Sequence, residues 1–238
     1  MAPLFEALGT PLPSRVRVAI GFTSRGARGR AIRECWDNRC SGDGHFEIFI
    51  RPDLAHAPDA MPAQIAAILA HELVHAAVGI AAGHGKAFKR VAVGLGLGIM
   101  ALSAGIDTVL TADSTGSSFT DSQVLRGVGT ILGMLFLNQA AISSVPPSQA
   151  GDAAGLFSAA RNLGGSFALA GIATVQDQRS FLHERRLEES LSANSQAVHD
   201  WLSGLSQQFG STEAGYRMIG NIVQQQALVM TYNDLFFI

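Results

Sequence analysis

The spacing of apolar and polar residues in the N-terminal part of the chain predicts a few short strands followed by a helix. Residues 15–22 (RVRVAIGF) and 45–51 (HFEIFIR) alternate apolar and polar positions, as half-buried strands do, and residues 31–36 form a third, shorter candidate strand. Residues 64–78 (QIAAILAHELVHAAV) place apolar side chains at helical spacing with no helix-breaking residue. Strands followed by a helix indicate an α+β domain.

Residues 91–175 have a different pattern, with long uncharged segments at 91–106, 127–151 and 162–176. The run within residues 123–145 is long enough to cross a bilayer, contains glycines that allow close helix packing, and stops at Pro146 and Pro147. Arg161 is a charge embedded in the last apolar segment. The pattern alone fits membrane spans and fits the core helices of a soluble domain equally well.

Composition places the whole chain between these two classes. Hydrophobic residues make up 47% of its 238 residues and charged residues only 15%, below the roughly 25% usual for soluble domains. Mean hydropathy is +0.23. The net charge of −2 excludes a global basic field that would favour nucleic acid. The N-terminus lacks a basic segment followed by an apolar one, so we expect no signal peptide and a cytoplasmic N-terminal domain.

The strongest candidate for chemistry is HELVH at residues 71–75, inside the predicted helix. Residues four apart share a helix face, so His71 and His75 can bind one metal ion. Glu72 would stand beside the open coordination position, where its carboxylate can take a proton from a water and pass it on. A catalytic zinc site needs a third protein ligand. His84 is the nearest candidate, with Gly83 and Gly85 allowing the chain to turn back.

The alternative is that these histidines form a hydrogen-bonded or surface cluster, since this five-residue pattern also arises by chance. A metal is favoured because unpaired histidines and a glutamate are costly to bury on so apolar a helix. Three neutral nitrogen ligands and an open position suit Zn²⁺ without excluding other metals.

The segment HELVHAAVGIAAGHGKAFKRVA resembles the active-site segment of SprT-like (Spartan-type) zinc metallopeptidases. The resemblance covers about residues 1–97 and implies a zincin-like fold, His71, His75 and His84 as zinc ligands, and Glu72 as the catalytic acid and base. Phe88 matches an aromatic residue of that motif, which we interpret as packing. Related proteins cleave proteins crosslinked to DNA, so the resemblance implies a protein or peptide substrate and a DNA association. The four-cysteine zinc ribbon of many members is absent from this sequence.

The other residues that could carry chemistry have weaker patterns. Cys35 and Cys40 have no second pair, so we expect ordinary reduced cysteines. His45 and His56 lie outside the motif and are interpreted as structural. A small basic cluster surrounded by glycines could touch phosphate, but a solvated loop is the expectation; it comprises Arg25, Arg28, Arg30 and Arg33.

Three segments stand out within residues 98–238, namely LRGVGTILGMLF, SSVPPSQAGDAAGLFSAARNLGGSFALA and QQQALVMTYNDLFFI. Together they resemble the drug:proton antiporter branch of the major facilitator superfamily. This resemblance implies all-α, membrane-type helices through residues 98–176 and a polar loop near 177–216. About three spans are present of the roughly twelve to fourteen in such carriers, so this segment is not expected to transport anything by itself.

Two resemblances thus meet near residues 94–100, as in a fusion, and predict two domains, 1–97 and 98–238. The leading hypothesis is a zinc-dependent peptidase. The second is a membrane-embedded carrier fragment with the N-terminal domain as a passenger, and a third is a zinc site that is inactive because the join disturbs it. The sequence does not indicate the oligomeric state.

Overall fold

The computed structural model describes residues 1–21, 33–52, 54, 62–191 and 195–238. These residues divide into two compact units. The first unit comprises Met1–Ser103 with Thr120–Ala159, and the second comprises Ala104–Phe119 with Ala160–Ile238. Short 3₁₀ turns lie between the main elements, namely η2 (Asn38–Cys40), η3 (Ile80–Ala82), η4 (Asp107–Val109), η5 (Gly116–Phe119) and η6 (Pro147–Gln149).

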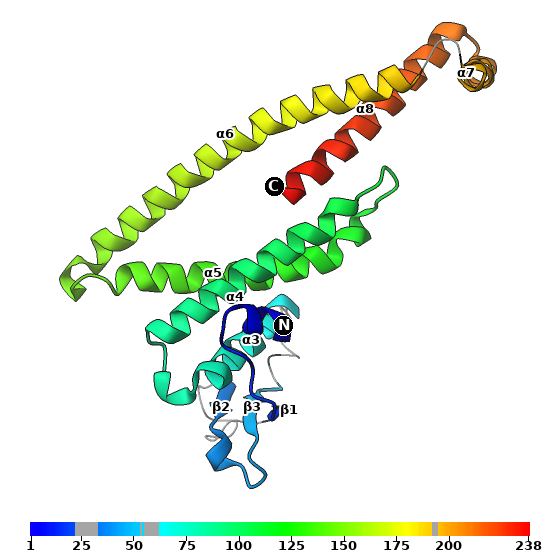
Figure 1. Cartoon of the computed structure of the whole chain (residues 1–238). Coiled ribbons are helices and arrows are strands. Elements are labelled where there is room, and N and C mark those ends of the chain that lie inside the picture. The colour runs from blue at the N-terminus through cyan, green and yellow to red at the C-terminus, as the bar shows by residue number, and fades with distance from the viewer. Residues whose placement is uncertain (22–32, 53, 55–61, 192–194) are drawn as a thin grey trace. The chain divides into compact units, whose positions relative to one another are not determined.

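A three-stranded sheet lies at the N-terminal end of the first unit (Figure 1). Strands β1 (Val16–Ile20), β2 (Arg33–Trp36) and β3 (Phe46–Ile50) have the order β1-β3-β2. β1 pairs with β3 in parallel, with Val16 opposite Phe46, and β2 pairs with β3 antiparallel. All three strands fall inside the predicted segments. The predicted half-buried pattern is confirmed in β3, where the alternate residues Ile48 and Ile50 are buried.

Helices α3 (Pro62–Val78) and α4 (Lys86–Ile106) build most of the core of the first unit. α3 begins with a proline, which is favoured at the first helical position, and covers the predicted helix. It contacts both β2 and β3. α4 buries one apolar face against α3 and against the short helix α1 (Ala2–Ala7), whose Phe5 belongs to the same core. The sheet therefore anchors one side of α3 and leaves the other side to α4 and its neighbours.

Helix α5 (Thr120–Ile142) completes the same core. It contacts α3 along its length, and its Val128, Leu132 and Phe136 are buried with the α3 and α4 side chains. The helix stops before Pro146, in agreement with the predicted breaker. Glycines bring α5 close to α4, because a Cβ on Gly96 would lie 2.5 Å from the backbone nitrogen of Gly133. No larger residue fits at Gly96 without moving one helix.

The predicted boundary between residues 97 and 98 falls inside α4, which runs unbroken from Lys86 to Ile106. That boundary had assigned residues 1–97 to the N-terminal domain and the rest of the helix to the apolar segment. In the structure, residues up to Ser103 and the whole of α5 belong to the first compact unit. The physical reason is the shared core, since Leu95 and Ile99 on either side of the boundary are both buried in it.

The second unit is made of helices from the C-terminal part of the chain. α6 (Ala150–Ser190) enters it at Ala160, and α7 (Gln196–Phe209) and α8 (Thr212–Phe237) pack on each other. α8 also contacts η4. Just after η4, the backbone N–H of Leu110 donates to Oδ1 of Asn233 at 3.0 Å, and Nδ2 of Asn233 donates to the carbonyl oxygen of Leu110 at 2.9 Å. The polar stretch 177–216, which resembled a loop, is largely helical, because its charges occupy the exposed faces of α6 and α7.

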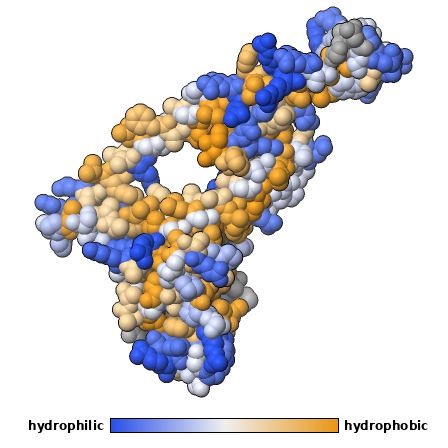
Figure 2. Space-filling view, viewed as in Figure 1, coloured by the Kyte–Doolittle hydropathy of each residue, from blue (hydrophilic) through white to orange (hydrophobic). Residues whose placement is uncertain are grey.

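Two helical segments within the described residues are long and apolar enough to cross a membrane, Lys86–Val109 and Gly116–Ile142. The third expected span, 162–176, lies in α6, which does not meet these criteria because polar residues interrupt its apolar run. Core helices of soluble proteins meet the same criteria, and 39% of the first segment is buried inside the protein. Figure 2 shows apolar side chains on the outer surface of the long helices, whereas the end with the sheet is largely hydrophilic.

We predict that the α4–α5 contact tolerates no methyl group at Gly96. Gly96→Ala should destabilise the chain by about 1–3 kcal/mol, because the added carbon meets the α5 backbone. The matched control is Gly105→Ala on the same helix, where nothing lies within 4 Å, and it should be neutral or slightly stabilising. Thermal unfolding followed by circular dichroism measures both. Equal effects of the two substitutions would contradict the close approach.

Candidate metal centre

The three candidate ligands come from α3 and from the turn that follows it. His71 and His75 lie one helical turn apart on α3, and His84 lies between η3 and the start of α4. Gly79 and Gly83 have φ of +85° and +48°, so these two glycines reverse the chain. Gly85, which we had paired with Gly83 for this role, does not have positive φ. A Cβ there would lie 3.0 Å from the carbonyl oxygen of Ala82, so it serves a close approach instead.

The turn brings the three imidazoles together. Nε2 of His84 lies 3.1 Å from Nε2 of His71 and 3.2 Å from Nε2 of His75. One ligand atom from each histidine lies within 4.8 Å of the others. Nitrogens bound to tetrahedral zinc at 2.0–2.1 Å are roughly 3.3 Å apart. Because a ring nitrogen can donate only one proton, hydrogen bonding explains this three-way convergence less well than a shared metal ion does.

Burial keeps the helix-borne histidines neutral, as metal binding requires. It lowers the pKa of His71 to about 3, with further lowering by the charges of Arg33 and the other two histidines. It also lowers the pKa of His75 to about 4, helped by His84 and Arg33. Nδ1 of His75 is buried and has no hydrogen-bond partner, so packing against Phe88 rather than a bond at Nδ1 holds this edge of the ring. These properties suit a metal ligand set in which protons compete weakly.

Glu72 is buried directly behind the first ligand, with a partner that the sequence did not indicate. Its Oε1 lies 2.6 Å from Nε of Arg33 on β2. Burial raises the pKa of Glu72, and the nearby guanidinium of Arg33 opposes that shift. Arg33 was one member of the basic cluster that we expected in a solvated loop. The strand that carries it lies against α3 instead, which brings the guanidinium to the carboxylate.

Two aromatic rings pack against the imidazoles, Phe88 from α4 and Phe136 from α5. The Phe88 ring is buried, with ring centroids 5.0, 4.3 and 4.9 Å from those of His71, His75 and His84. The Phe136 ring of α5 lies 5.5 Å from His71 and 6.4 Å from His84. Sequence motifs could locate Phe88 but not Phe136, because the latter is 52 residues after His84 and only the tertiary fold unites them.

Two cavities open beside the histidines and share His71, Leu135 and Phe136 in their linings. One has a volume of about 380 Å³ and the other about 410 Å³. The first is otherwise lined mainly by apolar residues of α3 and α5, together with Arg33 and Gln64. The second also contains His84 and the polar side chains of Asn138, Gln139 and Ser143. Both cavities therefore adjoin the histidine cluster.

The remaining candidate residues do not belong to the histidine cluster, although Cys35 is near enough to Glu72 for that carboxylate to help raise the pKa of its thiol. Cys35 and Cys40 are free thiols, and burial raises the pKa of Cys35 to about 12. Nδ1 of His45 lies 2.9 Å from the carboxylate of Asp43. Arg161 is exposed on α6. Four of the predicted residues lie outside the described part of the chain, namely Arg25, Arg28, Arg30 and His56.

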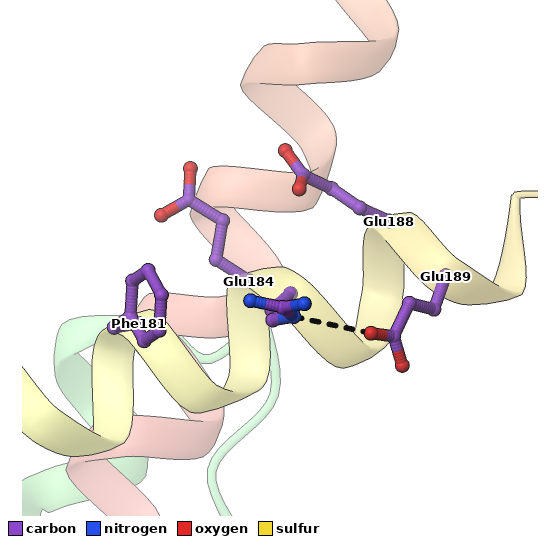
Figure 3. A pocket seen from close by; sticks show the side chains of 5 residues that line it. Phe181, Glu184, Glu188 and Glu189 are labelled. Carbon is purple, nitrogen blue, oxygen red and sulfur yellow. Dashed lines mark hydrogen bonds and ion pairs between the residues drawn. The ribbon is translucent and has the colours of Figure 1, made fainter.

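A further pocket, of about 490 Å³, lies on the polar end of α6 (Figure 3). Phe181, Glu184, Arg185, Glu188 and Glu189 line it. Arg185 forms an ion pair with Glu189 at 3.2 Å, and the carboxylates of Glu184 and Glu188 project from the same helix. All the lining residues belong to residues 181–189 of α6, about two and a half turns of one helix. This arrangement is a charged helix face rather than a ligand site.

Comparisons with known proteins concern the carrier resemblance. The chain is 28% identical over 115 residues to the colistin resistance protein EmrB of Acinetobacter baumannii, and 28% identical over 114 residues to the fatty acid resistance protein FarB of Neisseria gonorrhoeae. Each match covers 48% of this chain, which spans about a fifth of the length of these relatives (21% and 22%). No family model and no solved structure matches the chain.

These matches support the presence of a major facilitator superfamily fragment. A match of 115 residues is longer than residues 1–97, so it includes part of the apolar region. Membrane association is plausible from these relatives together with the two apolar helices. The SprT-like resemblance and the zincin-like fold have no support from the comparisons and stay predictions.

We predict that the purified chain binds about one zinc ion, and that His75→Ala abolishes the binding by removing one of three convergent nitrogens. His45→Ala is the matched control, because His45 contacts Asp43 and lies outside the cluster. Metal content by plasma mass spectrometry after dialysis measures both variants. A folded chain without metal, or equal metal in the two variants, would contradict the site.

Proposed function

We propose that the chain is a membrane-associated fragment related to drug:proton antiporters and that its first unit carries a zinc site. The matches to the two resistance proteins carry the first part of the proposal. The two apolar segments, Lys86–Val109 and Gly116–Ile142, supply candidate spans. A carrier of this superfamily needs two helix bundles around a central path. Since the chain spans about a fifth of its relatives, we propose that it does not transport by itself.

The zinc part of the proposal rests on the donor set. His71, His75 and His84 would hold the ion, and their convergent Nε2 atoms fit a tetrahedral metal with one position left open. Bound there, zinc would polarise a substrate carbonyl and acidify a water molecule. We place the sheet and the histidine cluster of this unit on the cytoplasmic side of the membrane, and a protein or peptide substrate is part of the same proposal.

A second candidate function, peptide hydrolysis, is favoured by the place of Glu72 beside the ligands. Its buried carboxylate would accept a proton from the attacking water and deliver it to the leaving amine. Arg33 now holds that carboxylate at 2.6 Å. Glu72 must therefore share or release this ion pair to take up a proton. If Arg33 holds it permanently, the unit binds zinc without cutting peptides.

We predict that lipid vesicles retain the chain through the exposed apolar face of α4. Leu97 is 54% exposed on that helix. If this face meets lipid, Leu97→Arg should weaken vesicle binding strongly, since an arginine at the centre of a span costs about 2.5–3.5 kcal/mol on insertion scales. Ile20→Arg, on the exposed β1 strand, is the control and should bind as the unmodified chain does. Flotation with phospholipid vesicles measures retention. A chain that stays monodisperse without detergent and does not float would overturn the membrane part.

We predict that Glu72→Gln lowers the rate of peptide cleavage by at least about 100-fold, the usual contribution of general acid–base catalysis, while the zinc content stays the same. Glu6→Gln, an exposed change of the same type on α1, should leave the rate unaltered. A fluorogenic casein assay with parallel metal analysis gives both quantities. Unchanged proteolysis in the Glu72 variant would exclude Glu72 as the proton carrier.

A further inference from the structure

We propose that the 380 Å³ cavity on the Arg33 side of the metal centre is a subsite for a bulky apolar side chain of a peptide. This inference rests on the peptidase candidate and specifies its substrate class. It goes beyond the metal site, because the cavity is built partly by α5, which has no place in the metal-binding motif.

The lining of the cavity defines what it can hold. α3 contributes Ala67 and Ile68, and α5 contributes Ile131, Leu132 and Leu135 from the opposite side. The volume lies within the range of about 300–1,000 Å³ usual for small-ligand sites. Most of the lining residues are apolar, with Arg33, Gln64 and His71 as the polar members, so a polar side chain would recover only part of its lost hydration there. An aliphatic or aromatic side chain would gain from the same burial.

The position of the cavity ties its occupant to the chemistry. His71 lines the cavity with a ring that also belongs to the metal cluster. Arg33 lines it too, and its Nε contacts the Glu72 carboxylate. A peptide side chain bound in this cavity would therefore lie next to His71 and Arg33, so the adjacent peptide bond would lie near the metal ligands and Glu72.

The second cavity differs from the first in the polar groups that line it. It shares His71, Leu135 and Phe136 with the first cavity and also carries Asn138, Gln139 and Ser143, with Lys89 Nζ donating to Ser143 Oγ at 2.9 Å. Both cavities expose mainly apolar surface, and the first has Arg33 and Gln64 as its own polar groups. The predicted preference concerns the substrate position whose side chain enters the first cavity.

The test uses four fluorescent pentapeptides, Ala-Ala-Xaa-Ala-Ala, with Leu, Phe, Gln or Asp at Xaa. Binding is measured by anisotropy on the full chain in chelator, and cleavage is measured separately after zinc is added. We expect the Leu and Phe peptides to bind roughly tenfold or more tightly than the Asp peptide, the difference expected for burying one large apolar side chain.

Substitutions on α5 separate a direct role from a structural one. Ile131→Lys should remove the preference for Leu and favour the Asp peptide, because Ile131 is 40% exposed and lines only this cavity of the two beside the metal. Leu137→Lys is the matched control, since Leu137 is 38% exposed on the same helix and lines neither cavity. Helix content and zinc content show that both variants keep the fold. If the preference for the Leu peptide over the Asp peptide reverses in the Ile131 variant and not in the Leu137 variant, a general loss of stability cannot explain it.

The outcomes distinguish the subsite from the peptidase. Preferential binding of Leu and Phe without cleavage in zinc keeps the subsite and removes the peptidase. Cleavage of all four peptides at equal rates keeps the peptidase and overturns the subsite. Equal binding of the four peptides in chelator, or no binding of any, also overturns the subsite.

Discussion

The burial of helix α4 is the constraint on which the rest of the first unit depends. Phe88 in its first turn supports all three imidazoles, and Leu95 and Ile99 further along pack into the same core. Burial of each such side chain contributes roughly 1.5–3 kcal/mol, which helps to fix α4 against α3. His84 directly precedes the helix, so its position follows from that packing. At the buried Gly96 of α4, α5 approaches closely enough to place Phe136 beside the metal ligands.

α4 is also apolar enough to contact a membrane. Packing in the protein core and contact with lipid involve different faces of this helix. The inward face is occupied by α1 and α3, so lipid can reach it only if the core of the metal unit opens. The outward face carries Leu97, Ala101 and Leu102, which are exposed in the structure. A metal unit and a carrier-like apolar segment can therefore share α4, provided that the membrane contacts only the outward side.

The sequence predicted those features that depend on local spacing. The three strands, the helix that carries HELVH, and the proline stop after α5 lie where the patterns placed them. The convergence of His84 with His71 and His75 also follows from the short glycine-containing turn. Features that depend on distant segments could not be predicted in this way. The Arg33–Glu72 ion pair requires β2 to lie against α3, and the Phe136 contact requires the Gly96 approach between two helices. The predicted boundary at 97 and 98 marks a change of composition, whereas packing continues through it.

The histidine cluster and the apolar helix α5 belong to one compact unit. Amide hydrogen exchange with and without zinc tests this arrangement, because a ligand that stabilises a unit slows exchange throughout that unit. Zinc should slow exchange in α3, in α4 and in residues 128–136 of α5 together. If zinc slows exchange around His71 and His84 while α5 exchanges at an unchanged rate, α5 does not belong to the unit that binds the metal.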